Sequence, residues 1–290
     1  MKNKKQNYSF FWAISLALFL IIILISNRTI FADSEKDTTL IIPPVASEEN
    51  AYQATVKIIV PIFDEKDKKI YSGNGTGWVA GAVKIKGEKI VLVVTNSHVV
   101  ASLVSGEHPE LVKEPRAVVF YDKNKKKIGG YPFGVLVYSD SKLKRQDIAV
   151  LGVVGIPDNL DLFIYNIEGN FPEKGEKVTT IGFPSDNPGP VKKEFKVTVS
   201  GGGKKSFDGC AFSGEAGPGQ SGSPVFNDKF KVIGMIWGYI DYNLILFKKR
   251  INYLVPIDEL QTYIDDALEV VEKFDFKTIK GIPIAQDPRE

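Results

Sequence analysis

Short apolar runs separated by clusters of Gly, Pro, Asn and Lys dominate the chain from residue 51 onward. The runs alternate apolar with polar residues or are rich in β-branched side chains, which is the pattern of strands. The predicted strands are residues 54–63, 76–84, 90–95, 116–121, 134–138 and 148–153, then 177–182, 195–199, 206–212, 224–226, 231–238 and 244–250. Two such sets with tight turns predict an all-β fold of two antiparallel six-stranded β-barrels, at about residues 51–155 and 156–255.

One segment near the C-terminus has helical spacing instead. Asp258 with Gln261 three residues later is a capping-box pattern. Apolar residues follow on one helical face, namely Leu260, Ile264, Ala267, Leu268 and Val271. The pattern predicts a C-terminal α-helix at about 258–273 that packs on the second barrel, followed by a tail at 275–290.

The N-terminal 32 residues have the pattern of an export signal. Lys2, Lys4 and Lys5 precede an uncharged, mostly apolar run of 18 residues at 9–26. Because a span of about 30 Å of hydrocarbon needs roughly 20 residues, a signal peptide cleaved near Ala32 and an uncleaved membrane anchor both remain open. Either form predicts an extracytoplasmic protein, secreted or tethered through residues 9–26. Polar residues 33–50 predict a flexible linker.

Composition narrows the possible functions. Of 290 residues, 43% are hydrophobic and 25% charged, as in soluble globular proteins. The formal net charge is +2, and four cations with no acid lie before residue 33, which leaves 33 cationic and 35 acidic residues, or −2, in the rest. This balance argues against a nucleic-acid partner. The single cysteine, Cys210, excludes an intramolecular disulfide and a zinc site built on cysteine pairs.

Two polar residues stand beside apolar strands. His98 follows the apolar run 91–94 within Thr95-Asn96-Ser97-His98-Val99-Val100, and Asp147 directly precedes Ile148-Ala149-Val150-Leu151. Taken singly, His98 is either a structural histidine or a general base, and Asp147 is either a strand-start residue or a group that orients an imidazole. Asp140 is a second candidate carboxylate, but it lies among polar residues, where burial against a histidine is less favoured.

The strongest motif is Gly217-Pro218-Gly219-Gln220-Ser221-Gly222-Ser223-Pro224. A serine hydroxyl attacks a carbonyl only if a base takes its proton and backbone N–H groups meet the oxyanion. Gly219 and Gly222 let the backbone turn sharply around Ser221, which leaves the Gly219 and Ser221 amides free to point into one hole. A plain Gly/Pro turn is the alternative.

The order along the chain is His98, Asp147, Ser221, unlike the Ser, acid, His order of α/β-hydrolases. The chain resembles the trypsin-like serine peptidases of the chymotrypsin fold, most closely protease domains of the bacterial Deg/HtrA type. Besides the three motifs above, the resemblance rests on Gly75-Thr76-Gly77-Trp78-Val79, Gly175-Glu176-Lys177-Val178, Ile181-Gly182-Phe183-Pro184, Val232-Ile233-Gly234-Met235 and Val255-Pro256-Ile257-Asp258. The matching stretches lie within residues 52–270, and we expect the peptidase domain to cover 51–274.

The resemblance implies a role for each motif residue. Ser221 is the expected nucleophile, His98 the general base and then acid, and Asp147 the group that orients His98. The Gly219 and Ser221 amides form the expected oxyanion hole between the two barrels. The segment Ile236-Trp237-Gly238 is the expected strand that pairs with an extended substrate. No metal or organic cofactor is implied, and the expected partners are protein or peptide substrates.

Some features depart from the family pattern. Deg/HtrA proteins usually carry PDZ domains, and the residues after Phe274 are too few for one. Gln220 has no charge, and no Ile-Val-Gly-Gly sequence begins the domain, so activation through a new N-terminal salt bridge is not expected. We expect a secreted or membrane-tethered serine endopeptidase of bacterial type. A non-catalytic peptide-binding module on the same fold and an esterase with the same triad remain alternatives. Oligomeric state and natural substrate stay open.

Glu215 is the candidate specificity residue. In trypsin-like peptidases the position six residues before the nucleophile lies at the base of the primary specificity pocket, and here that position is Glu215. A carboxylate there would favour Lys or Arg before the scissile bond, because a paired charge recovers what a lone buried charge loses. The alternative is a Glu215 side chain that points to solvent.

Overall fold

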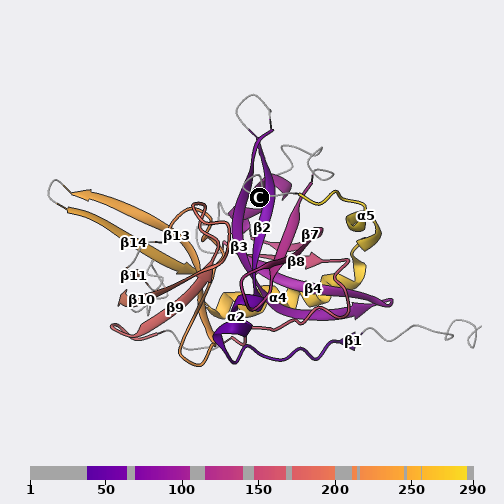
Figure 1. Ribbon diagram of the computed structural model, residues 1–290, viewed down its shortest axis with the longest axis horizontal. Coiled ribbons are helices and arrows are strands. Elements are labelled where there is room, and N and C mark those ends of the chain that lie inside the picture. The colour runs from indigo at the N-terminus through magenta and orange to yellow at the C-terminus, as the bar shows by residue number, and fades with distance from the viewer. Residues whose placement is uncertain are drawn as a thin grey trace, which may run out of the picture.

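The computed structural model contains two antiparallel β-sheets that pack side by side (Figure 1). It describes residues 38–63, 69–104, 115–139, 147–167, 172–199, 211–213, 216–244, 247–255 and 257–285. The helices are short or lie near the ends of this region, so the molecule is mostly β, as the alternating apolar pattern predicts. The two sheets differ in closure, and each is described in turn.

The first sheet has eight strands rather than the predicted six. Its path is β6-β5-β2-β3-β4-β8-β7, with β1 paired to β3, and the path does not close into a ring. The strands are β1 (Thr38–Thr39), β2 (Thr55–Phe63), β3 (Lys69–Ile85), β4 (Glu88–Thr95), β5 (Ala117–Tyr121), β6 (Lys127–Tyr131), β7 (Phe133–Tyr138) and β8 (Ala149–Val153). Two antiparallel sheets are present as predicted, but within the described residues the first has eight strands and does not form a closed six-stranded barrel. β1 has only two residues, and β6 carries two glycines and little apolar pattern, so neither gives a strand signal.

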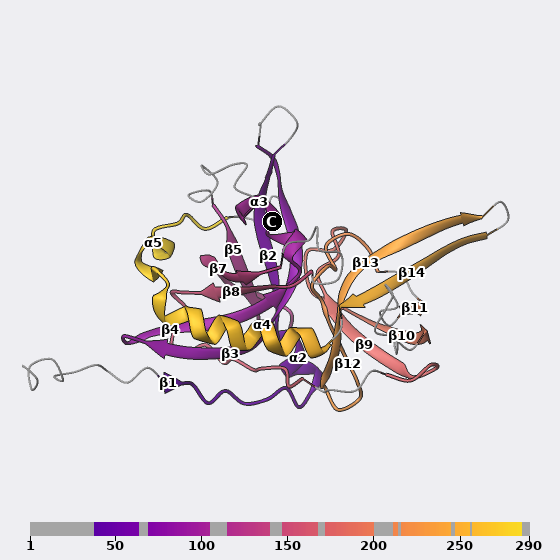
Figure 2. The ribbon, with the colours of Figure 1, turned by 180° about the vertical axis from the view of Figure 1, so that it is seen from behind.

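The second sheet is a closed barrel of six strands, as predicted. Its order is β10-β11-β14-β13-β12-β9. The strands are β9 (Lys177–Gly182), β10 (Val191–Val199), β11 (Ala211–Ser213), β12 (Pro224–Phe226), β13 (Val232–Leu244) and β14 (Phe247–Val255). The turn between β13 and β14 follows Leu244 instead of preceding it, and this long hairpin extends away from the barrel (Figures 1 and 2). Of the strand predicted at 206–212, residues 206–210 lie outside the described residues.

Residues 38–50 of the predicted linker at 33–50 make defined contacts with the rest of the chain, whereas residues 33–37 lie outside the described residues. Ser47 caps α2 (Glu48–Ala54) by accepting a hydrogen bond from the Asn50 amide at 3.2 Å. Val45 is buried and its amide donates to the Ile164 carbonyl at 2.8 Å. A cap and a few buried residues order this segment, although its composition is polar.

The predicted C-terminal helix is present, and it packs against both sheets. It consists of α4 (Ile257–Val270) followed by the 3₁₀ turn η4 (Val271–Lys273), and a second short helix, α5 (Phe276–Lys280), occupies the predicted tail. Buried residues of α4 join a core that includes residues of β4, β8, β13 and β14. Figure 2 shows α4 lying along the first sheet, with the second barrel beyond one end. The predicted packing on the second barrel is present but covers only part of the contact, because the apolar face of α4 covers the junction of both sheets.

The described helices include none that is both long and apolar enough to span a membrane. The apolar run at 9–26 lies outside the described residues, so the choice between signal peptide and anchor stays a prediction.

Burial along α4 gives a matched test of the packing. Leu260 is fully buried, whereas Leu268, predicted on the same apolar face, is 37% exposed. Leu260→Ala should lower the free energy of unfolding by about 2 to 5 kcal/mol, because it leaves a cavity, and Leu268→Ala by less than about 1 kcal/mol. Urea unfolding midpoints measure both. Equal losses would contradict the described orientation of α4.

Candidate active site

His98 lies where the first sheet ends in a tight turn. The buried strand β4 stops at Thr95, and the chain enters the 3₁₀ turn η1 (Ser97–Val99), which precedes the short helix α3 (Ala101–Val104). The Asn96 side chain fixes this turn by donating from Nδ2 to the Asp147 carbonyl at 2.8 Å. The His98 side chain is 42% exposed. A rigid strand end thus presents the imidazole at the surface while its backbone is held.

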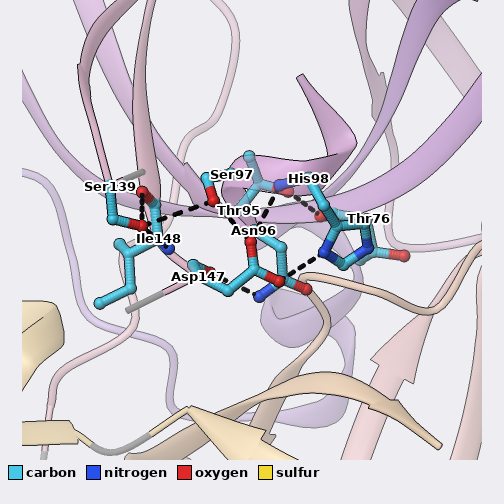
Figure 3. A network of polar contacts seen from close by, with 8 residues as sticks. All are labelled: Thr76, Thr95, Asn96, Ser97, His98, Ser139, Asp147 and Ile148. Carbon is cyan, nitrogen blue, oxygen red and sulfur yellow. Dashed lines mark hydrogen bonds and ion pairs between the residues drawn. The ribbon is translucent and has the colours of Figure 1, made fainter. Parts of the chain in front are cut away.

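Asp147 is buried directly beside this turn. Its position follows from the register of β8 on β4, in which Ala149 pairs with Thr95. One carboxylate oxygen, Oδ2, is bonded to the His98 Nδ1 atom. The other, Oδ1, accepts from the Ser97 hydroxyl at 2.6 Å and from the His98 amide at 2.9 Å (Figure 3). The Asp147 carboxylate is therefore hydrogen-bonded to both the ring and the backbone amide of His98.

These bonds act on the ionisation of Asp147. Burial acts to raise the pKa of Asp147, but hydrogen bonds from the His98 ring, the Ser97 hydroxyl and the His98 amide, with the charge of His98, hold this pKa below its ordinary value. An ionised carboxylate accepts hydrogen bonds and donates none, so Nδ1 must carry the ring proton toward Asp147. The Nε2 atom is then the ring nitrogen that Asp147 does not contact.

Two serines behind Asp147 were not predicted as site residues. Ser97 donates to Asp147, and the buried Ser139 places its Oγ 3.4 Å from the Ser97 Oγ. Ser139 is fixed by the Ile148 amide, which donates to its Oγ at 2.9 Å. The position of Ser97 next to His98 could have indicated a role in the site. Nothing in the sequence around Ser139 indicates one. Asp140, the rival carboxylate, lies outside the described residues.

The loop that carries Ser221 is folded by its own polar groups. The Gln220 amide donates to the Gly217 carbonyl at 3.2 Å, and the Ser223 amide to the Gln220 carbonyl at 3.0 Å. The fully buried Gln220 side chain accepts from the Gly217 amide at 2.9 Å. From the sequence, Gln220 was notable only for its lack of charge. In the structure its side chain closes the turn.

Gly222 brings this loop against the strands that lead to His98. It has a φ of +84°, and a Cβ atom there would overlap the Thr76 carbonyl and lie 2.5 Å from the Thr95 Oγ1 atom. Across the same contact, the Thr76 amide donates to the Ser221 carbonyl at 2.9 Å, and the Thr95 hydroxyl to the Thr76 carbonyl at 2.7 Å. Thr95 lies three residues before His98. The segments of His98, Asp147 and Ser221 therefore meet where the two sheets join.

Two amides of the loop have no hydrogen-bond acceptor within the described part of the chain, and they are those of Gly219 and Ser221. The loop's remaining amides, at positions 217, 220, 222 and 223, all donate within the protein. The Pro218 carbonyl accepts from the Ser185 amide at 2.8 Å. Because N–H and C=O point in opposite directions in a trans peptide, this bond turns the Gly219 amide away from Ser185. These two amides are the ones predicted to form an oxyanion hole.

The segment 236–238 lies beside the same loop. Ile236 donates to the Ser223 carbonyl and accepts from the Gly222 amide, both at 2.9 Å, so it holds the loop that carries Ser221. The pairing of β13 with β14 shifts between Ile236 and Gly238, which makes Trp237 a bulge. Trp237 and Gly238 are half-buried, and a Cβ atom at Gly238 would meet nothing within 4 Å. Glu215, the candidate specificity residue, lies outside the described residues.

No group of three or more His, Cys, Asp or Glu side chains within the described ranges is placed to hold a metal ion. The arrangement found there is an imidazole oriented by a buried carboxylate, a serine on a tight loop, and two amides without an acceptor. Such a set of groups is suited to acyl transfer.

Comparison with known families agrees with this geometry. The family model described as the trypsin-like peptidase domain matches residues 75–235, more than half of the chain and a stretch that includes His98, Asp147 and Ser221. The chain belongs to the trypsin-like peptidase family. Family membership makes it a hydrolase of the serine protease class, and the two-sheet architecture is consistent with the chymotrypsin fold. The closer likeness to Deg/HtrA domains stays a prediction.

The lowered pKa of Asp147 predicts a dependence of stability on pH. A carboxyl whose pKa is lower in the folded than in the unfolded chain stabilises the fold above its unfolded pKa, and this contribution is lost as the pH falls through the folded value. The stability advantage of the wild type over Asp147→Asn should therefore be fully present above about pH 5 and shrink as the pH falls below about 4. Urea unfolding across this range measures it. An advantage that is constant down to the lowest pH would contradict the prediction.

Proposed function

We propose that the protein is a serine endopeptidase that hydrolyses protein substrates through Ser221, His98 and Asp147. The single observation that carries this proposal is the buried carboxylate of Asp147, which accepts hydrogen bonds from the ring and the amide of His98. A merely structural aspartate at a strand start would not need to hold an exposed imidazole. The contact of Gly222 with Thr76 and Thr95 supports the placement of Ser221 beside that imidazole.

The first half of the reaction forms an acyl-enzyme. The Nε2 atom of His98 takes the proton of the Ser221 hydroxyl, and the Oγ atom attacks the scissile carbonyl carbon. The negative charge that develops on the carbonyl oxygen is met by the Gly219 and Ser221 amides. Asp147 stabilises the imidazolium. When the intermediate collapses, the C–N bond breaks and the leaving amine takes the proton from His98.

The second half repeats the same steps with water. His98 takes a proton from the water, and the water oxygen attacks the acyl carbon. The oxyanion again lies against the two amides, and collapse breaks the bond to the Ser221 Oγ atom, which takes its proton back from His98. No other acid or base is needed, because the same imidazole serves both halves.

Substrates are proposed to bind as extended strands. The segment 236–238 adjoins the nucleophile loop, and the open space at Gly238 leaves room for a chain beside it. Pairing of main chains along such an edge selects peptides in strand form. Glu215 is retained as the proposed specificity residue, with a preference for Lys or Arg. The proposed site of action is extracytoplasmic, because of the N-terminal apolar run.

Two alternatives use the same fold. A peptide-binding module would not need an ionised Asp147 on the imidazole, so the described pair favours catalysis. An esterase would use the same groups, and only the substrate distinguishes it.

Labelling of the nucleophile tests the proposal directly. A fluorophosphonate probe should modify the wild type and not Ser221→Ala, and cleavage of casein should fall by about 10⁴ to 10⁶ in Ser221→Ala and His98→Ala, because the triad acts as a unit. Ser223→Ala is the matched control, since it removes a serine hydroxyl two residues away and should keep the label. Casein cleavage at the wild-type rate by Ser221→Ala would refute the assignment.

Asp147→Asn tests the orienting role. The amide oxygen can still accept from Ser97 and the His98 backbone, but the amide nitrogen would donate to Nδ1 and force the proton onto Nε2. Turnover should fall by about 10⁴ through this wrong tautomer. Asp140→Asn, at the rival carboxylate, should have a mild effect. The reverse ranking in steady-state assays would transfer the role to Asp140.

A further inference from the structure

Thr76 connects the first sheet to two other segments, the loop that carries Ser221 and the residue that follows β9. It is fully buried in β3, and its amide and carbonyl bind Ser221 and Thr95, as described above. Its hydroxyl is used twice more. The Oγ1 atom donates to the Gly219 carbonyl at 2.8 Å and accepts from the Phe183 amide at 2.9 Å. Both bonds cross from the first sheet to the second, over more than a hundred residues of sequence.

The hydrogen bond from the Thr76 hydroxyl is the second one that fixes the backbone around Gly219, after the bond from the Ser185 amide to the Pro218 carbonyl. Gly219 has a φ of +87°, and a Cβ atom there would collide with the Phe183 carbonyl and lie 2.9 Å from the Ser185 nitrogen. Glycine populates positive and negative φ about equally, so the residue itself does not fix the direction of its amide. The Ser185 amide donates to the Pro218 carbonyl, which precedes the Gly219 amide. The Thr76 hydroxyl donates to the carbonyl of Gly219 itself.

We propose that the Thr76 hydroxyl is a positioning group for the oxyanion hole. With both flanking carbonyls anchored, the two peptide planes around Gly219 have one orientation, and the Gly219 amide is directed away from Ser185. Phe183, whose amide donates to the same hydroxyl, orients it so that its proton faces Gly219. The inference rests on the proposed function, and it assigns Thr76 a task that the triad does not include.

A purely structural role for Thr76 is the competing explanation, and Thr180 provides the matched control. Thr180 is also fully buried, lies on β9, and donates its hydroxyl to the Pro224 carbonyl at 2.7 Å. Its partner belongs to β12 and not to the turn at 217–220. Thr180→Val thus removes a comparable buried hydrogen bond from the second barrel without releasing Gly219.

The experiment compares Thr76→Val, Thr76→Ser and Thr180→Val by kcat and KM on a fluorogenic casein-derived peptide. Removal of one oxyanion donor costs about 10²- to 10³-fold in kcat, so a donor that is misdirected for part of the time should cost about 10- to 100-fold. Thr76→Val should show this loss with KM within about threefold, whereas Thr76→Ser and Thr180→Val should stay near wild type. Equal kcat values for Thr76→Val and Thr180→Val would overturn the inference.

A second measurement depends on the oxyanion hole alone. A peptide aldehyde forms a hemiacetal with the nucleophile, and its oxygen occupies the hole, whereas the corresponding peptide alcohol does not. Thr76→Val should lower the affinity for the aldehyde by about the factor lost in kcat. The affinity for the alcohol should not change. Unchanged aldehyde affinity would contradict the role. Thr76→Ala, which also lacks the hydroxyl, replaces Thr76→Val in both assays if the valine variant does not fold.

The two proposals fail in different ways. A wild-type protein that neither reacts with the fluorophosphonate nor cleaves the peptide contradicts the proposed function. A wild type that does both, with a Thr76→Val variant of unchanged kcat, contradicts only the role of Thr76.

Discussion

The close approach of Gly222 to Thr76 is the contact on which the arrangement of the site depends. At this point the turn after Ser221 touches the backbone of the first sheet, and no space remains for a side chain. The contact fixes the distance between the strand that leads to His98 and the loop that carries Ser221. The hydrogen bonds from the Thr76 amide and the Thr95 hydroxyl then set its direction. A single close packing of backbone on backbone thus aligns residues from two separate sheets.

Asp147 is held by hydrogen bonds and not by close packing. Its buried, charged carboxylate is hydrogen-bonded to Ser97 and to the amide and ring of His98. An isolated carboxylate in this place would be neutralised by desolvation, because burial disfavours the ionised form. Donors from Ser97, from the His98 amide and from the His98 ring reverse that balance. The cost of burial is offset only while all these donors are in place, so the turn η1 and the ionisation of Asp147 stabilise each other.

Sequence patterns predict the elements that have a strong local signal. The strand at 177–182 matches β9, and the run at 54–63 matches β2 to one residue, because buried strands alternate or concentrate β-branched residues. β6 and α2 were missed because Gly-rich pairing and a seven-residue capped helix are stabilised by their neighbours. The triad candidates follow from motif order, whereas the tasks of Ser139, Thr76 and the Ser185 amide depend on contacts between residues far apart in sequence. Such contacts leave no local pattern.

The dependence of the Ser221 loop on the first sheet also affects the order of events during folding. Hydrogen bonds within the loop fold the turn at 217–223, but the close contacts around Gly219 and Gly222, both at positive φ, come from other segments and form only when the two sheets dock. A nascent or half-folded chain would carry every reactive side chain and yet lack an aligned nucleophile and oriented amides. The proposed hydrolysis therefore depends on docking of the two sheets, because only the docked chain holds the Ser221 loop against Thr76 and Thr95.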